Sequence, residues 1–159
     1  MKKQIFLFLA LALIVAGGAF AQQAGSVFNG NGNRYEVVSQ TMSWEDAKRE
    51  AERRGGYLAT ITSAEENALV QNLIAGGDRR CYWIGGYCEN DRVWKWVTGE
   101  PMNYTNWAPG EPSNSGRNQD KMCIIRRPYN NRVALGQWDD DRNTINEYGF
   151  VIEWDYLVR

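Results

Sequence analysis

The feature that most limits how this chain can fold is a polar segment of more than twenty residues, 98–119, which has neither helical nor strand periodicity. It contains most of the stretch NWAPGEPSNSGRNQD, with two prolines, two glycines and almost no apolar side chain that could reach a core. Ordering such a segment costs conformational entropy that apolar burial cannot offset. Loops of this length in compact domains are usually functional or disordered. We therefore expect either a mobile loop or a polar ligand that organises it.

The sequence before this loop predicts two helices. One begins at the N-cap Ser43 and ends before Gly55, and the other begins at the capping box of Ser63 and ends at Gly76. The apolar stripes expected to face the core are Trp44, Ala47 and Ala51 in the first helix, and Ala68, Leu69 and Leu73 in the second.

Strands are predicted mainly in the second half of the chain, where aromatic and β-branched residues gather. The expected strands are 34–38, 81–85, 93–97, 122–125 and 149–154, with a short strand-like connector at 57–61. Helices early and strands late indicate an α+β domain, since a chain of βαβ units would alternate them.

The first 21 residues have the layout of a secretory signal peptide. Two lysines precede an apolar run at 5–15, and small residues lead to Ala21, after which we expect cleavage. The expected location is therefore secreted or periplasmic, with an uncleaved anchor as the alternative. Residues 22–159 then form a single domain without a membrane span. Losing two lysines takes the formal net charge from −1 to −3, which leaves no basic excess for binding nucleic acid.

Acidic and amide side chains are concentrated at two places that could together hold calcium. Glu111, Asp139 and Asp140 offer carboxylates, and Ser113 and Gln119 offer neutral oxygens, which suits the six to eight oxygen ligands of Ca²⁺. An EF-hand is excluded, because a loop counted from Asp139 has no Gly at its sixth position and no Glu at its twelfth. The alternatives are a solvated turn or charged edge strand, or the paired carboxylates of a glycosidase.

Several motifs, in order, resemble the C-type lectin-like domain. They are YEVVSQTMSWEDAKREAERRGGYLATITSAEEN, then YWIGGYCENDRVWKWVTGEPMNYTNWAPGEPSNSG, then GQWDDDRNTINEYGFVIEW. The resemblance covers about residues 28–156. It implies two helices packed on small antiparallel sheets, a long ligand-binding loop and no catalytic activity.

The resemblance also implies a ligand set for calcium. In that family a Glu-Pro-Asn tripeptide, a later Glu and a Trp-Asn-Asp tripeptide hold one calcium ion, to which sugar hydroxyls bind directly. By position, the ligands here are Glu111, Ser113, Gln119, Asp139 and Asp140. The family's proline, Pro112 here, is typically cis. Ser113, Gln119 and Asp139 depart from the pattern, but three negative charges are kept. The loop residue Trp107 is expected to support the loop rather than to stack on a sugar.

The cysteines differ from those of the family. Its long disulfide would join positions 51 and 152, which are Ala51 and Ile152 here, so packing is expected to replace the bond. The pairing of the three cysteines, Cys81, Cys88 and Cys123, stays open. Zinc is excluded by their spacing and by the absence of histidine.

These features predict a secreted, non-catalytic binding module that recognises carbohydrate with calcium as cofactor, its partner being a glycan. The alternative is a calcium-independent adhesion module that binds a surface protein, which the Ser113 and Gln119 departures favour. An enzyme related to the formylglycine-generating fold is disfavoured by the chain's small size. The sugar and the oligomeric state are left open.

Overall fold

The computed structural model describes residues 27–28, 32–89 and 92–155, and the expected signal peptide lies outside these residues. The elements are β1 (Val27–Phe28), β2 (Arg34–Val38), α1 (Trp44–Arg53), β3 (Tyr57–Leu58), α2 (Ala64–Ala75), β4 (Cys81–Cys88), β5 (Trp94–Trp96), the 3-10 turn η1 (Ser115–Arg117), β6 (Lys121–Ile125), β7 (Trp138–Asp141) and β8 (Gly149–Trp154). The α+β class is thereby confirmed. None of the described helices is long and apolar enough to cross a membrane.

The strands form one connected sheet in the order β1-β2-β8-β4-β6-β7, with β3 paired to β8 and β5 paired to β4. Small antiparallel sheets were expected; the antiparallel ladders are instead joined by one parallel pair, β4 with β8, in which Tyr82 lies opposite Gly149. A Cβ atom at Gly149 would lie 2.4 Å from the carbonyl oxygen of Val38 and 2.6 Å from the Tyr82 ring. Only glycine therefore allows this close approach.

Helix α1 forms as the sequence predicts. The Ser43 side chain accepts a hydrogen bond from the backbone N–H of Asp46 at 3.1 Å, and Trp44, Ala47 and Ala51 are its buried residues. The Trp44 indole Nε1 donates to the carbonyl of Ile84 at 2.8 Å, which fixes the start of the helix against β4.

Helix α2 begins at the expected cap but buries a different face. Its buried residues are Asn67, Val70 and Ile74, whereas Ala68 is exposed and Leu69 and Leu73 are half-buried. Leu69 and Leu73 still pack against the core, so the expected stripe is confirmed in part, although the most buried face lies beside it. Apolar side chains surround most of this helix, so their spacing does not define one face. Two hydrogen bonds of the Asn67 side chain, to Gly136 and Trp138, hold the face of the helix that carries Asn67 inward.

The long disulfide of the family is replaced by apolar packing. Ala51 and Ile152 are both fully buried and belong to the same core cluster. The three cysteines form no disulfide with one another; Cys81 and Cys123 are buried and Cys88 is half-buried. Burial raises the pKa of the Cys123 thiol.

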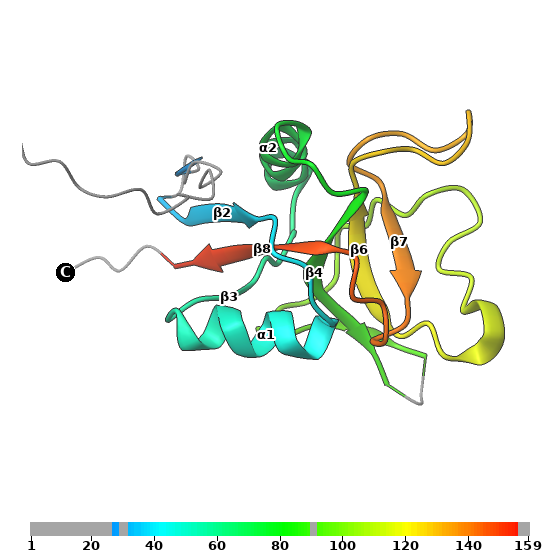
Figure 1. The fold of residues 1–159 in the computed structure, drawn as a ribbon, viewed down its shortest axis with the longest axis horizontal. Coiled ribbons are helices and arrows are strands. Elements are labelled where there is room, and N and C mark those ends of the chain that lie inside the picture. The colour runs from blue at the N-terminus through cyan, green and yellow to red at the C-terminus, as the bar shows by residue number, and fades with distance from the viewer. Residues whose placement is uncertain (1–26, 29–31, 90–91, 156–159) are drawn as a thin grey trace, which may run out of the picture.

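The long loop lies at one side of the molecule. In Figure 1, the segment between β5 and β6 extends beyond β6 and β7, while β2 and β8 lie at the opposite side between α1 and α2. The described ends of the chain are therefore far from the loop.

Candidate metal centre

The loop is fixed to β7 through backbone hydrogen bonds on both sides of Trp107. The N–H of Ala108 donates to the carbonyl of Trp138, and the N–H of Trp138 donates to the carbonyl of Asn106, each at 2.8 Å. The Trp107 ring packs against Trp94 with 4.8 Å between ring centroids and edge-on against Trp138 at 5.8 Å. Trp107 thus supports the loop, as the sequence predicts.

Strand β7 is held from the other side by helix α2. The Trp138 indole Nε1 donates to Asn67 Oδ1 at 2.8 Å, and Asn67 Nδ2 donates to the carbonyl of Gly136 at 3.2 Å. Both side chains are buried. The amide of Asn67 thereby orients the strand that carries Asp139 and Asp140, a role that the sequence analysis missed.

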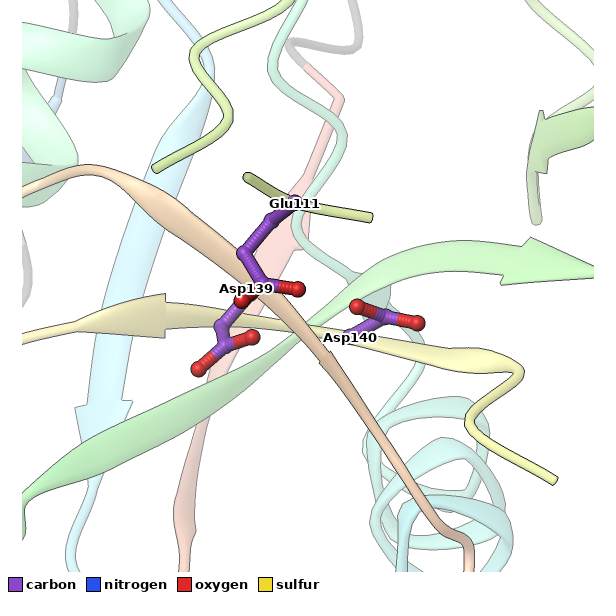
Figure 2. Close-up of side chains that lie close together, drawn as sticks. All are labelled: Glu111, Asp139 and Asp140. Carbon is purple, nitrogen blue, oxygen red and sulfur yellow. The ribbon is translucent and has the colours of Figure 1, made fainter. Parts of the chain in front are cut away.

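Three carboxylates converge where the loop meets β7. Glu111, Asp139 and Asp140 each place a carboxylate oxygen within 4.8 Å of the others, so that together they could hold a metal ion. Figure 2 shows Glu111 reaching from its own loop segment toward the two aspartates of β7. The peptide bond between Glu111 and Pro112 is cis, as the resemblance implies.

Asp140 is the most enclosed of the three, with 1% of its surface exposed. Its Oδ1 accepts the backbone N–H of Ser113 at 2.8 Å, and its Oδ2 accepts the backbone N–H of Asn114 at 2.7 Å. The Ser113 N–H also lies 2.8 Å from Glu111 Oε2. These bonds satisfy a buried carboxylate with loop backbone donors and fold the loop over it.

The two neutral residues expected in the metal shell belong to the same cluster. Ser113 Oγ donates to Gln119 Oε1 at 3.3 Å, and Gln119 Nε2 donates to the Asp140 carbonyl at 2.9 Å. The structure therefore brings all five expected residues to one place. The side-chain N–H of Gln119 donates to the backbone of β7, so the side-chain carbonyl oxygen of Gln119 faces Ser113.

Asn114 is a further contributor that the sequence analysis missed. Its Oδ1 accepts the backbone N–H of Gln119 at 3.2 Å, closing the turn that contains η1. Its φ of 46° lies in the left-handed region, where asparagine is enriched among non-glycine residues. The Asn-Ser-Gly sequence at 114–116 is typical of a turn and could have indicated this role.

Burial and mutual repulsion oppose ionisation of these carboxylates. Desolvation, reinforced by Glu111, raises the pKa of Asp139 to about 7. Desolvation and a contact with Glu111 raise the pKa of Asp140 to about 6, although two backbone donors act in the opposite direction. A divalent cation placed among these oxygens would reverse both effects, because it stabilises the charged forms.

In addition to this arrangement of the loop, β7 and the carboxylates, the sequence matches a known protein family. The family model described as "Lectin C-type domain" matches residues 40–150. The chain belongs to the C-type lectin domain family. Lectin C-type domains are non-catalytic binding domains, which agrees with the expectation that this chain is not an enzyme.

Sequence similarity to individual proteins supports membership of the same family. The chain is 34% identical over 118 residues to the galactose-specific lectin nattectin of Thalassophryne nattereri, covering 68% of this chain and 72% of nattectin. It is 36% identical over 94 residues to ladderlectin of Oncorhynchus mykiss, covering 57% of this chain and 48% of ladderlectin. A match to halomucin of Haloquadratum walsbyi, 34% identical over 140 residues, covers 79% of this chain and 2% of halomucin. The chain thus spans less than two thirds of the last two proteins.

Solved structures show the same fold. The carbohydrate-recognition domain of the mouse scavenger receptor C-type lectin is 28% identical, with a TM-score of 0.68, over 83% of this chain and 96% of that chain. A calcium-independent type II antifreeze protein, 24% identical with a TM-score of 0.68, covers 89% of this chain and 100% of its own. The second likeness concerns the fold alone.

Proposed function

We propose that this protein is an exported module that binds carbohydrate through a calcium ion held by Glu111, Ser113, Gln119, Asp139 and Asp140. The observation that carries the proposal is the convergence of three carboxylates within 4.8 Å, beside two neutral oxygen donors. Calcium affinity follows the charge and rigidity of such a site. Here the charge comes from the three acids, and the rigidity comes from the loop's hydrogen bonds to β7.

The residues beside Asp140 leave room for a sugar; of the three carboxylates, Asp140 alone lines this space. A hollow of about 240 Å³ is lined by Trp94, Pro112, Ser113, Asn114, Gln119 and Asp140, together with Cys88 and Arg92. When bound, calcium would supply a positive centre for sugar hydroxyls, and the surrounding hydroxyl and amide groups would orient the ring. The galactose-specific name of nattectin supports sugar as the ligand class.

Two measurements test the proposal. Thermal melting of the purified protein is expected to shift upward when millimolar calcium replaces EGTA, since a ligand that binds only the folded state stabilises it. Magnesium serves as the control, because it prefers a smaller octahedral site. A glycan array run with calcium and with EGTA is expected to show binding that EGTA removes. An unchanged melting temperature at millimolar calcium overturns the metal site.

A second candidate is a calcium-independent protein-binding module, favoured by one specific observation. The Asp140 carboxylate already accepts two loop N–H groups, so protein groups alone satisfy it. Under this alternative, calcium changes neither stability nor binding, and the module binds a purified surface protein equally well in EGTA. Glycan binding that requires calcium excludes it.

A further inference from the structure

The hollow beside the carboxylates continues into a larger one. The larger hollow has a volume of about 710 Å³, and four of its lining residues also line the smaller hollow. The shared residues are Cys88, Arg92, Asn114 and Gln119. A ligand that places one sugar in the smaller hollow beside Asp140 can therefore extend into the larger hollow without leaving the surface of the protein.

Two arginines give this larger hollow its chemical character. Arg92 and Arg117 both line it and both are exposed. Across residues 32–89 and 92–155, neither guanidinium lies within ion-pair distance of a carboxylate. Each is therefore available to an anion from outside.

The acidic residues that line the same hollow each lie near a lysine, and two of them share one lysine. Glu89 lies 3.1 Å from the amine of Lys95. Asp120 and Glu45 lie 3.0 Å and 3.7 Å from the amine of Lys121. These pairs leave the two arginines as the cations of the hollow without a described partner, and an Arg guanidinium matches carboxylate and sulfate oxygens with its planar array of donors.

The backbone at both arginines is unusual. Arg92 has a φ of 57° and Arg117 a φ of 63°, in a region that side chains other than glycine rarely adopt. Backbone outliers of this kind cluster at ligand-binding sites. The two positions place their side chains at the same hollow from separate segments, one before β5 and one at the end of η1.

We propose that Arg92 and Arg117 form a subsite for an anionic substituent, a sulfate ester or a carboxylate, on a glycan whose neutral sugar binds at the candidate calcium site. This inference rests on the proposed function and specifies its ligand class. Arg92 lines both hollows, so it contacts the region between the calcium-bound sugar and the charged group. Arg117 lines only the larger hollow and recognises the charged group itself.

The test compares three matched oligosaccharides in calcium: a neutral one, the same one with a sulfate ester, and the same one with a uronic acid. Both anionic forms, or one of them, are expected to bind at least about fivefold more tightly than the neutral form, a preference that falls as salt is raised. The anionic probe that shows the larger gain in affinity over the neutral probe identifies whether the subsite prefers a sulfate ester or a carboxylate.

Variants separate the subsite from the calcium site. Arg117→Gln is expected to bring the anionic probes to the affinity of the neutral probe while leaving the neutral affinity unchanged, and Arg92→Gln is expected to act in the same direction. Arg132→Gln, at an exposed arginine between β6 and β7, is the control and should change nothing. Melting temperatures confirm that each variant is folded.

The outcomes are distinct for the two proposals. Calcium-dependent binding that is equal for neutral and anionic probes overturns the subsite and leaves the proposed function standing. An anionic preference that survives both arginine variants also overturns the subsite. Absence of calcium-dependent binding to every probe overturns the proposed function and this subsite with it.

Discussion

The buried carboxylate of Asp140 accepts a hydrogen bond of 2.8 Å from the backbone N–H of Ser113, 27 residues earlier in the chain. This bond connects the polar loop to β7, the strand that precedes β8. It places a residue of the candidate metal site in a second role, because the same carboxylate organises the loop through protein donors alone. Loop order and ion binding can therefore be measured separately.

Replacing Asp140 is expected to destabilise the protein even in EGTA. Asp140→Ala removes the acceptor for two loop N–H groups, and each lost hydrogen bond to a charged group costs on the order of 1.5–3 kcal/mol. Relief of the desolvation and repulsion that raise the pKa of Asp140 offsets part of this loss. Urea unfolding in EGTA measures the loss, and limited proteolysis reports loosening between residues 111 and 119. A variant as stable as the parent, with an equally resistant loop, contradicts this role.

Replacing Glu111 is expected to weaken calcium binding, and in the metal-free protein to relieve the repulsion that, together with desolvation, raises the pKa of Asp139 and Asp140. Glu111→Gln removes one of three charges while keeping the shape of the side chain. At a calcium concentration of about 100 times Kd, the parent gains about 2.7 kcal/mol, and the variant should lose most of that gain at the same concentration. Calcium titration of the melting temperature gives both values. Glu65→Gln, at an exposed position on α2, is the matched control and should keep the full response.

Asn67 is expected to matter for stability and for the site together. Asn67→Ala leaves the fully buried indole N–H of Trp138 without its acceptor, which costs about 1–3 kcal/mol. Denaturant unfolding measures this loss, and near-ultraviolet circular dichroism reports the environment of the tryptophan. Asn72→Ala makes the same change at an exposed position of the same helix. Equal stability of the two variants would show that the indole bond contributes nothing.

Glu153 is expected to make the protein less stable as the pH rises. Burial raises the pKa of Glu153 from 4.5 to about 7, against the opposing effect of hydrogen bonds from Thr60, Tyr35 and Asn33. The folded state thus holds this proton more tightly than the unfolded state. Its effect on stability is absent below about pH 4.5 and grows to on the order of 3 kcal/mol of destabilisation above pH 7.

The variant Glu153→Gln, which stays neutral, should show a shallower decline in unfolding free energy between pH 5 and pH 8. Some decline persists in EGTA, because the pKa of Asp139 is raised in the same direction. Glu147→Gln, at an exposed position, is the control and should retain the parent's slope. Parallel pH profiles for the parent and Glu153→Gln contradict the assignment.

The three thiols are expected to differ in reactivity. Cys88 is half-buried and borders both hollows, whereas Cys81 and Cys123 are buried. A thiol reagent should therefore modify one cysteine quickly in the native protein and all three after denaturation. Rapid native modification of two or three cysteines contradicts this packing.

Much of the fold follows from local patterns that the sequence displays. Strands 34–38 and 149–154 have the predicted bounds, because aromatic and β-branched residues are concentrated in them. The cap at Ser43 and the face with Ala47 and Ala51 were likewise readable. In each of these elements, the residues that determine the structure are close together in the chain.

The parts that were missed depend on distant partners. The three aspartates of β7 read as a solvated turn or a charged edge strand, and β7 does lie at an edge of the sheet. The burial of Asp140 was missed, because it depends on loop N–H groups 26 and 27 residues away. Asn67 turns α2 toward Trp138, 71 residues later. The family resemblance supplied the five site residues, but it did not supply the amides of Asn67 and Asn114 that position them.

The placement of the loop opposite β2 and β8 has a consequence for how the domain can be attached to something else. A tether joined to the described chain beyond β8 leaves from the side away from the long loop and β7 (Figure 1). Copies fixed in this way to a surface or to a larger chain would all point their loops outward. Weak single-site contacts could then add up across copies, since linked sites gain from a high effective concentration.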